Sequence, residues 1–279
     1  MTVAVILAGG LGTRLRSEVP GLPKPLAPIH GRPFLEYQMD YWIDQGVDTF
    51  VLSIGYLHEK VIAHFGRSYR NSKIEYAIEE SPLGTGGGLM LALDKVRNTE
   101  SFLLLNGDTY FAVDFSHLKQ FSEQKNADWT FALFKTSDTQ RYMGVKLDKD
   151  QRIMRMGIKS QVATCLANGG VYLIKTAAMF DTSLLKKFLV GTKASLEADI
   201  VTYELERGAR MFGLESDGVL LDIGLPVDYK ASFTLFESSH KLTVLLSCSL
   251  KILMPLLPLS SRCCLIKICT LSSPMQLMQ

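Results

Sequence analysis

The sequence predicts an α/β fold with a mixed, mostly parallel central sheet that is flanked by helices and carries a small antiparallel β portion. Two observations support this prediction. Strand-like and helix-like segments alternate over residues 1–110, and such alternation is typical of a parallel sheet covered by helices. Between residues 129 and 175, strand-like segments follow one another with few helical stretches between them, which favours antiparallel pairing there.

The amino-terminal half alternates apolar runs with segments of helical spacing. A helix is expected from Pro33, because proline suits the first helical position, and Gly46 is expected to end it. An unbroken apolar run before Asn106 is typical of a central strand covered on both faces. The strands expected here are Val3–Leu7, Thr49–Ile54, Lys73–Ile78 and Phe102–Leu105, with a second helix over Leu89–Val96.

The carboxyl-terminal half is expected to contain more β-structure. Asp148–Asp150 has the composition of a turn and predicts a hairpin. One helix is expected over Leu196–Arg207, and Pro226 is expected to begin another that runs to Glu237. The strands expected here are Trp129–Phe134, Val145–Leu147, Gly170–Ile174 and Val219–Leu221.

Composition limits the classes of function. A chain of 279 residues with 47% hydrophobic and 21% charged residues suits one large soluble α/β domain or two small ones. The net charge of +2 gives no reason to expect a nucleic-acid partner. The amino terminus lacks the basic region of a signal peptide, so we expect a cytoplasmic protein without a disulfide framework. The sequence leaves a homo-oligomer open.

Residues 240–279 have an atypical composition. They contain no Asp or Glu, and they carry four of the five cysteines. Lys251, Pro255 and Pro258 interrupt the apolar run, so no membrane span is expected. We therefore expect one domain over residues 1–239, followed by a tail that is poorly ordered or non-native.

The most informative segment is the glycine-rich stretch Gly9–Leu15, directly after the first expected strand. Its glycines let backbone N–H groups point at anionic oxygens, while Arg14 and Lys24 add positive charge suited to a phosphate chain. This combination indicates a nucleoside triphosphate site, although such turns also occur as simple tight turns. The P-loop pattern is absent, and Leu15 stands where the dinucleotide-binding pattern needs its third glycine.

Gly9–Leu15 followed by Pro23-Lys24-Pro25 resembles the signature of the sugar-1-phosphate nucleotidylyltransferases. The resemblance covers residues 1–237 and implies a single Rossmann-like nucleotidyltransferase domain. It continues, in the family's order, through Pro82–Gly87, Asn106–Thr109, Asn168–Tyr172 and Asp222–Gly224.

Asp108 and Asp222 are the candidate metal ligands. Each follows a strand-like run, and the carboxyl ends of strands in an α/β sheet open onto the ligand crevice. Two carboxylates at two strand ends can hold one Mg²⁺ together with phosphate oxygens and water, but such an aspartate can also only cap a turn. The resemblance implies that both are the family's metal ligands.

The resemblance also implies the residues that contact the two substrates. Some of these residues also have a purely structural explanation. Gly84–Gly88 can be a flexible connector, Lys159 an ordinary exposed lysine, and Glu197 an acid favoured at the start of a helix. Ile158 stands where the family usually has Glu before that lysine. The residues expected at the nucleotide are Leu7, Ala8, Gly9, Gly10, Gly12, Thr13, Gly84, Thr85, Gly86 and Gly107. Those expected at the sugar phosphate are Asn168, Gly169, Lys159 and Glu197.

The resemblance implies transfer of a nucleoside monophosphate from a triphosphate to a sugar 1-phosphate, with release of pyrophosphate. Arg14 is expected to hold the β- and γ-phosphates, Lys24 the α-phosphate and Lys159 the sugar phosphate. The chain is most similar to the D-glycero-D-manno-heptose 1-phosphate guanylyltransferases, which make GDP-heptose for surface polysaccharides such as lipopolysaccharide or capsule. The segments that carry this similarity are Leu22–Pro28, Phe34–Tyr37, Ser81–Gly87 and Arg141–Val145.

Other functions stay open at this point. The same motifs fit mannose-1-phosphate guanylyltransferases and uridylyl- or thymidylyltransferases. A regulatory homologue that only senses sugar nucleotides typically lacks the signature charges, but Arg14, Lys24, Asp108 and Asp222 are all present, which favours an enzyme. A metal-dependent glycosyltransferase usually shows Asp-x-Asp after a strand, whereas Tyr110 stands at the position of the second acid.

Overall fold

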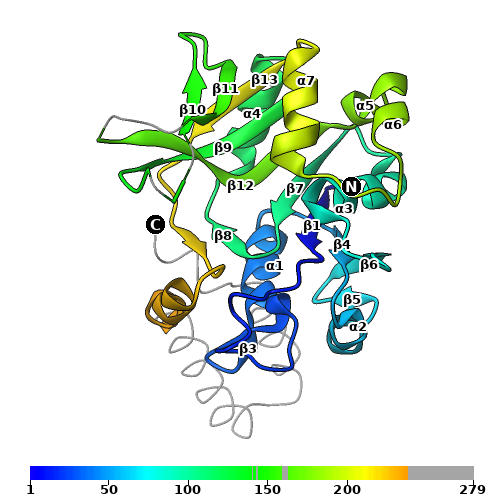
Figure 1. Ribbon diagram of the computed structural model, residues 1–279, viewed down its shortest axis with the longest axis vertical. Helices are drawn as coiled ribbons and strands as arrows, with labels where there is room; N and C mark the ends of the chain where they lie inside the picture. Colours follow the sequence, from blue (N-terminus) through cyan, green and yellow to red (C-terminus); the bar gives the residue numbers. More distant parts are fainter. Residues whose placement is uncertain (140, 143, 159–162, 238–279) are drawn as a thin grey trace, which may run out of the picture.

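The computed structural model describes residues 1–139, 141–142, 144–158 and 163–237 (Figure 1). Within these residues, ten strands form one central sheet, and two pairs of short strands form separate small sheets. No helix in this part of the chain is both long enough and apolar enough to cross a membrane. The expected tail, residues 240–279, lies outside the described residues.

Four parallel strands form the centre of the large sheet. Their buried side chains are mostly apolar, because helices cover both faces of this part of the sheet. The middle pair runs in register from Val3 opposite Thr49 to Ala8 opposite Ile54. In spatial order, the strands are β7 (Ser101–Asn106), β1 (Val3–Ala8), β4 (Thr49–Ile54) and β6 (Ser72–Ile78), and the short β5 (Ser68–Tyr69) pairs antiparallel with β6.

One long strand, β12 (Cys165–Lys175), organises the other part of the sheet. It pairs antiparallel with β7 and with β9 (Trp129–Thr136), and a register shift between Asn168 and Tyr172 interrupts the pairing with β9. The remaining strands are the hairpin β10 (Gly144–Leu147) and β11 (Ile153–Ile158), and β13 (Met211–Glu215). β10 also pairs with β12, and β13 runs parallel to β9.

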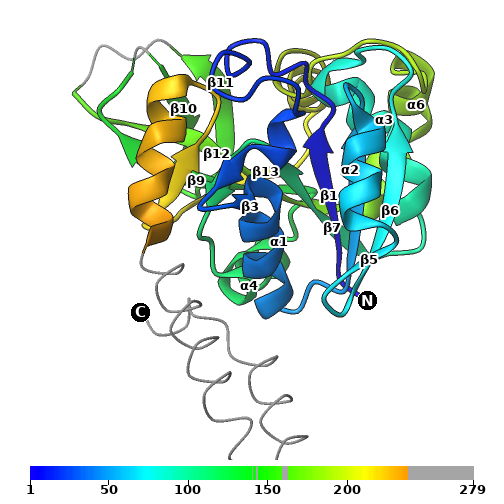
Figure 2. The ribbon, with the colours of Figure 1, turned by 90° about the horizontal axis from the view of Figure 1, so that it is seen from below.

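Helices pack on both faces of the sheet (Figures 1 and 2). Because side chains alternate along a strand, Leu103 and Leu105 of β7 join one buried cluster, and Phe102 and Leu104 join the other. The first cluster includes α1 (Phe34–Asp44), α2 (His58–Phe65) and α4 (Phe115–Gln124). The second includes α3 (Gly84–Val96), α5 (Thr176–Met179), α6 (Thr182–Lys187), the π-helical turn η2 (Leu196–Val201) and α7 (Thr202–Glu206).

A third apolar cluster joins the two ends of the described chain. Leu15 and Val19 of the first loop pack with Phe34 of α1 and with Phe236. Phe236 belongs to a helix at residues 226–237, shown in orange in Figure 2. The two small sheets, β2 (Pro28–Ile29) with β3 (Arg32–Pro33) and β8 (Thr109–Phe111) with β14 (Leu220–Asp222), add Ile29, Tyr110 and Leu221 to this cluster.

The predicted α/β class, with a mixed sheet whose parallel strands are central, is confirmed. Two predicted boundaries are wrong. α3 begins at Gly84 rather than at Leu89, because Gly86 and Gly87 lie against another segment, where both N–H groups donate to the Ala194 carbonyl oxygen. Pro33 lies just before the first turn of α1 and not within it. The hairpin predicted at Asp148–Asp150 joins β10 to β11. The sequence analysis does not predict α2, α4 or β13.

We expect Leu104→Ala to lower the free energy of unfolding by about 2–5 kcal/mol, because Leu104 is fully buried and its loss leaves a cavity in the cluster that it shares with α3. Met154 on β11 is 59% exposed, so Met154→Ala should change the same quantity by less than about 0.5 kcal/mol. Urea unfolding measures both. Equal losses in the two variants would contradict the assignment of β7 to the core.

Candidate functional site

The ends of β1 and β7 meet at the carboxyl edge of the parallel strands. The N–H of Gly107 donates to the Leu7 carbonyl oxygen at 2.9 Å. A Cβ at position 107 would lie 2.6 Å from that oxygen and 2.9 Å from Ala8 Cα, so the close approach requires glycine. Asp108, the next residue, is therefore placed beside the start of the first glycine-rich loop.

The turn that carries Asp108 is also held by α1. The side-chain amide of the buried Gln38 donates to the carbonyl oxygens of Asn106 (2.9 Å) and Thr109 (2.7 Å). These two acceptors flank Gly107 and Asp108 in the chain. A fixed side chain of the core therefore sets the backbone position of the candidate metal ligand.

Lys24 lies directly opposite Asp108. It belongs to the short 3-10 turn η1 (Lys24–Leu26), between Pro23 and Pro25, whose rings restrict the backbone. Lys24 Nζ lies 2.5 Å from Asp108 Oδ2, and the lysine side chain is only 12% exposed. A Cβ at Gly12 would lie 3.4 Å from Lys24 Cβ, so the first glycine-rich loop packs against this lysine.

The strand β14 brings Asp222 to the same place. Asp222 is opposite Thr109 in the antiparallel pair β8–β14, and the N–H of Ile223 donates to the Asp108 carbonyl oxygen at 2.9 Å. Asp222 Oδ1 accepts the N–H of Gly224 at 2.6 Å. The two candidate metal ligands, which are distant in sequence, are therefore neighbours in the structure.

An arginine that the sequence analysis quotes only as part of a motif contacts Asp222. Arg141 Nη2 lies 2.9 Å from Asp222 Oδ2 and 2.7 Å from Asp228 Oδ2. Asp228 is on the helix at residues 226–237. The pairing with Asp228 and Asp222 raises the pKa of Arg141, so its guanidinium stays charged.

Asp108 and Asp222 fit a hard divalent cation that binds together with substrate. Mg²⁺ is commonly bound by one or two carboxylates, with substrate phosphates and water as its other ligands. Among the described residues, no group of three or more His, Cys, Asp or Glu side chains could hold a metal ion. The chemistry of this pair therefore suits an ion completed by phosphate oxygens and water.

The first glycine-rich loop is packed tightly at its start. A Cβ at Gly9 would lie 2.0 Å from Oε1 of Glu79, a buried carboxylate. Glu79 accepts hydrogen bonds from the Ser53 hydroxyl at 3.1 Å and from the Leu83 N–H at 3.1 Å. Glycine at position 9 thus lets the loop lie directly on this carboxylate.

The rest of this loop is accessible. A Cβ at Gly10 would contact nothing within 4 Å, and Thr13 and Arg14 are both exposed. Gly12 has a φ of 59°, a conformation that favours glycine. This part of the loop is therefore open to solvent next to Lys24, and its predicted role at the nucleotide stays a prediction.

The residues predicted from the second glycine-rich stretch make local contacts at the start of α3. Gly86 donates its N–H to the Ala194 carbonyl oxygen at 2.9 Å, and the Thr85 hydroxyl accepts the N–H of Leu196 at 2.9 Å. Gly84 and Thr85 are exposed, whereas Gly86 is buried. These contacts explain the glycines structurally, and their predicted role at the nucleotide stays a prediction.

A cavity of about 460 Å³ lies beside β12 and η2, within the usual range for a small-molecule site. Asn168, Glu197 and Arg141 line it. Asn168 donates to the hydroxyl of the buried Tyr172 at 2.7 Å, and that hydroxyl donates to Glu197 at 3.0 Å. Burial raises the pKa of Tyr172, and nearby Glu197 raises it further, so the hydroxyl stays protonated and links the two predicted sugar-binding residues.

The other two residues predicted at the sugar phosphate have different outcomes. Gly169 is buried, and a Cβ there would lie 2.3 Å from the Phe111 ring, so packing requires glycine at this position. Lys159 lies outside the described residues.

Several residues of this site are not among the predicted ones. Gln38 follows Leu35 at helical spacing, so a polar residue on the apolar face of a helix is a signal that could have found it. Tyr172 and Arg141 lie inside motifs that the sequence analysis quotes without a role for them. For Asp228 we find no signal in the sequence, because its contact with Arg141 depends on the fold.

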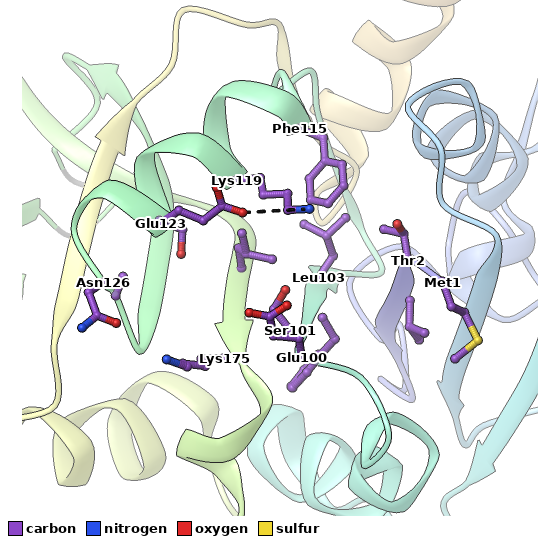
Figure 3. A pocket seen from close by; sticks show the side chains of 15 residues that line it. Met1, Thr2, Glu100, Ser101, Leu103, Phe115, Lys119, Glu123, Asn126 and Lys175 are labelled. Carbon is purple, nitrogen blue, oxygen red and sulfur yellow. Dashed lines mark ion pairs between the residues drawn. The ribbon is translucent and has the colours of Figure 1, made fainter.

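A different cavity, of about 310 Å³, lies at the opposite edge of the sheet, where β1 and β7 begin (Figure 3). Charged side chains from α4 and from the ends of strands surround it, and an ion pair joins Lys119 to Glu123 at 4.0 Å. None of the predicted site residues lines this cavity.

A family model described as "Nucleotidyl transferase" matches residues 3–238, which include every element of the site described above. The chain belongs to this nucleotidyl transferase family.

Similar proteins within the family include enzymes that act on sugar phosphates. The D-glycero-alpha-D-manno-heptose 1-phosphate guanylyltransferase of Aneurinibacillus thermoaerophilus is 40% identical over 227 residues, 81% of this chain and 95% of that protein. A mannose-1-phosphate guanylyltransferase of Mycobacterium tuberculosis is 31% identical over 229 residues, 81% of this chain and 62% of that protein.

The fold is similar to that of solved structures. The crystal structure of HddC from Yersinia pseudotuberculosis aligns with a TM-score of 0.72 at 31% identity and covers 85% of this chain and 100% of that one. HddC has also been solved in a form described as complexed with GMP-PN.

We expect Gln38→Leu to lower the free energy of unfolding by about 1–3 kcal/mol, because it removes the amide donor from two buried carbonyl oxygens. Gln124→Leu, at an exposed position on α4, is the matched control and should change stability by less than about 0.5 kcal/mol. Urea unfolding measures the free energy of unfolding of both variants. If Gln38→Leu is as stable as the wild type, the side chain of Gln38 does not hold the Asp108 turn.

Proposed function

We propose that this nucleotidyl transferase transfers GMP from GTP to D-glycero-α-D-manno-heptose 1-phosphate, releasing pyrophosphate and forming GDP-heptose. The observation that carries the proposal is the convergence of Lys24, Asp108 and Asp222 beside the first glycine-rich loop. Relatives named for this activity, 37–40% identical over 81% of the chain, support this choice of substrates.

The nucleotide contacts the amino-terminal loop in this proposal. The N–H groups of the loop face the triphosphate, and the exposed side chain of Arg14 holds the β- and γ-phosphates as they depart. The nucleoside lies toward the start of α3. The residues assigned to the nucleotide are Leu7, Ala8, Gly9, Gly10, Gly12, Thr13, Gly84, Thr85, Gly86 and Gly107.

Lys24 stabilises the charge that develops at the α-phosphate. Its side chain is mostly buried and paired with Asp108, and its backbone lies between two prolines, so little reorganisation is needed when the reaction begins. Asp108 and Asp222 are the proposed ligands of Mg²⁺, which would neutralise charge on the α-phosphate and on the sugar phosphate. The described residues therefore supply both a fixed ammonium and two carboxylates at one place.

The sugar 1-phosphate occupies the cavity beside β12 and η2. Asn168 and Glu197, which line the cavity, hydrogen-bond its hydroxyl groups. Gly169 is assigned to the same substrate as the neighbour of Asn168, and Lys159 is assigned to its phosphate. A phosphate oxygen of the sugar attacks the α-phosphorus of the nucleotide, and pyrophosphate leaves in line. No general base is needed, because a phosphate monoester is already anionic near pH 7.

A second candidate is the mannose 1-phosphate reaction, favoured by the 31% identity to the mycobacterial enzyme. It would use the same residues and the same chemistry. The higher identity to the heptose enzymes over nearly their whole length favours the heptose substrate. We place the activity in the cytoplasm, where GTP is available, and its product in the synthesis of surface polysaccharide.

We expect Lys24→Met and Asp108→Asn each to reduce the rate of pyrophosphate release by about 10²–10³-fold, because each removes a fixed charge from the reacting phosphates. Lys230→Met is the control: Lys230 is 67% exposed on the helix at residues 226–237 and should leave the rate unchanged. Near-normal pyrophosphate release by either site variant would refute the proposed roles.

Substrate choice is tested by pyrophosphate release across the four nucleoside triphosphates and a set of sugar 1-phosphates. We expect GTP with the heptose 1-phosphate to give the highest kcat/KM, by about tenfold or more over mannose 1-phosphate, since one differing substituent in a shaped pocket is worth that much. A higher kcat/KM with UTP or dTTP would assign the protein to another branch of the family.

A further inference from the structure

Both proposed metal ligands are already paired with a cation of the chain. Lys24 Nζ lies 2.5 Å from Asp108 Oδ2, and Arg141 Nη2 lies 2.9 Å from Asp222 Oδ2. The Asp222 pair is partly buried, at 24% and 25% exposure, so water screens it only in part. A divalent cation that binds Asp222 must therefore repel or displace the guanidinium.

Arg141 has a second partner that can keep it in place. The same nitrogen lies 2.7 Å from Asp228 Oδ2, on a different element from Asp222. The guanidinium also lies over the Tyr142 ring, with its carbon 4.9 Å from the ring centre. Arg141 can therefore release Asp222 and still be held near the site by Asp228 and Tyr142.

Arg141 also faces the sugar-phosphate cavity. It lines that cavity together with Asn168 and Glu197, and it is the only lysine or arginine among the described residues that do so. A phosphate monoester carries between one and two negative charges near neutral pH, and a guanidinium can bind two of its oxygens at once. A sugar phosphate bound in this cavity therefore gives Arg141 a second anion with which to pair in place of Asp222.

We propose that Arg141 exchanges Asp222 for the phosphate of the sugar 1-phosphate when a divalent cation takes that carboxylate, so that the two ligands bind cooperatively. This inference rests on the proposed function for the identity of the sugar phosphate. Arg141 is then a binding residue for the second substrate and a competitor of the metal in its absence.

The charges around Arg141 explain why the two ligands favour each other. Without ligands, the two cations Lys24 and Arg141 face the three carboxylates Asp108, Asp222 and Asp228, so the group carries a net charge of −1. A divalent cation alone changes this charge to +1, and a phosphate alone draws Arg141 away and leaves Asp222 unpaired. With both ligands, the phosphate offsets the charge of the cation, and such coupling must raise each affinity by the same factor.

The test measures Mn²⁺ binding to the full-length protein by electron paramagnetic resonance without nucleotide, so that no turnover occurs. Mn²⁺ is titrated alone and again with saturating heptose 1-phosphate, with mannose 1-phosphate as a second probe. In the wild type, we expect the sugar phosphate to lower the Kd for Mn²⁺ by about tenfold.

The variant Arg141→Met should bind Mn²⁺ more tightly than the wild type when no sugar phosphate is present, and the effect of the sugar phosphate should be lost. Arg141→Lys keeps the charge but not the planar fork, so it should retain only part of the coupling. Arg155→Met removes the same charge from an exposed position on β11 and should behave as the wild type.

Two results would overturn this inference: a wild-type Mn²⁺ affinity that does not respond to sugar phosphate, or wild-type coupling in Arg141→Met. Circular dichroism shows whether each variant folds, and Arg141→Lys decides the question if Arg141→Met does not. The proposed function fails separately, if the wild type shows the coupling but releases no pyrophosphate from any nucleoside triphosphate.

Discussion

The antiparallel contact between β8 and β14 is the interaction on which the site depends. It places Asp222 opposite Thr109 and so beside Asp108, although neither short strand belongs to the central sheet. An isolated two-stranded pair is marginal in water, because it buries too little apolar surface. Here Tyr110 and Leu221 are buried in the third apolar cluster, which also includes Phe236. The helix at residues 226–237 therefore supports the site through packing as well as through Asp228.

Local backbone constraints fix the opposite side of the site. Lys24 is held between two prolines, Gly107 allows the turn after β7 to contact β1, and Gln38 bonds the carbonyl groups on both sides of Asp108. Each constraint is satisfied within the folded chain before any ligand arrives. The ammonium of Lys24 and the carboxylate of Asp108 are consequently positioned by the core, and only their mutual contact needs to change on binding.

The sequence predicts those parts of the fold and site that depend on local pattern. The parallel strands follow from unbroken apolar runs, and the position of Asp108 follows from the strand before it. The start of α3 is missed because glycine has a low helix propensity, which contacts with Ala194 outweigh. The pairing of Asp222 with Thr109 and the ion pairs of Arg141 join segments distant in sequence, so no local pattern encodes them. The predicted role of Lys159 and the predicted end of the domain at residue 239 stay predictions.

The direction of β12 explains how the two proposed substrate sites meet. Because β12 runs antiparallel to β7, Val171 lies opposite Leu105 and Lys175 lies opposite Ser101. The residues before Val171, including Asn168, therefore extend past the carboxyl end of β7, toward the edge where Asp108 and the first glycine-rich loop lie. A parallel strand at this position would begin at the other edge, where Lys175 and Ser101 line the cavity of Figure 3. The antiparallel strand thus lets the proposed nucleotide residues that follow β1 and the proposed sugar residues of β12 lie at the same edge of the sheet, on either side of β7.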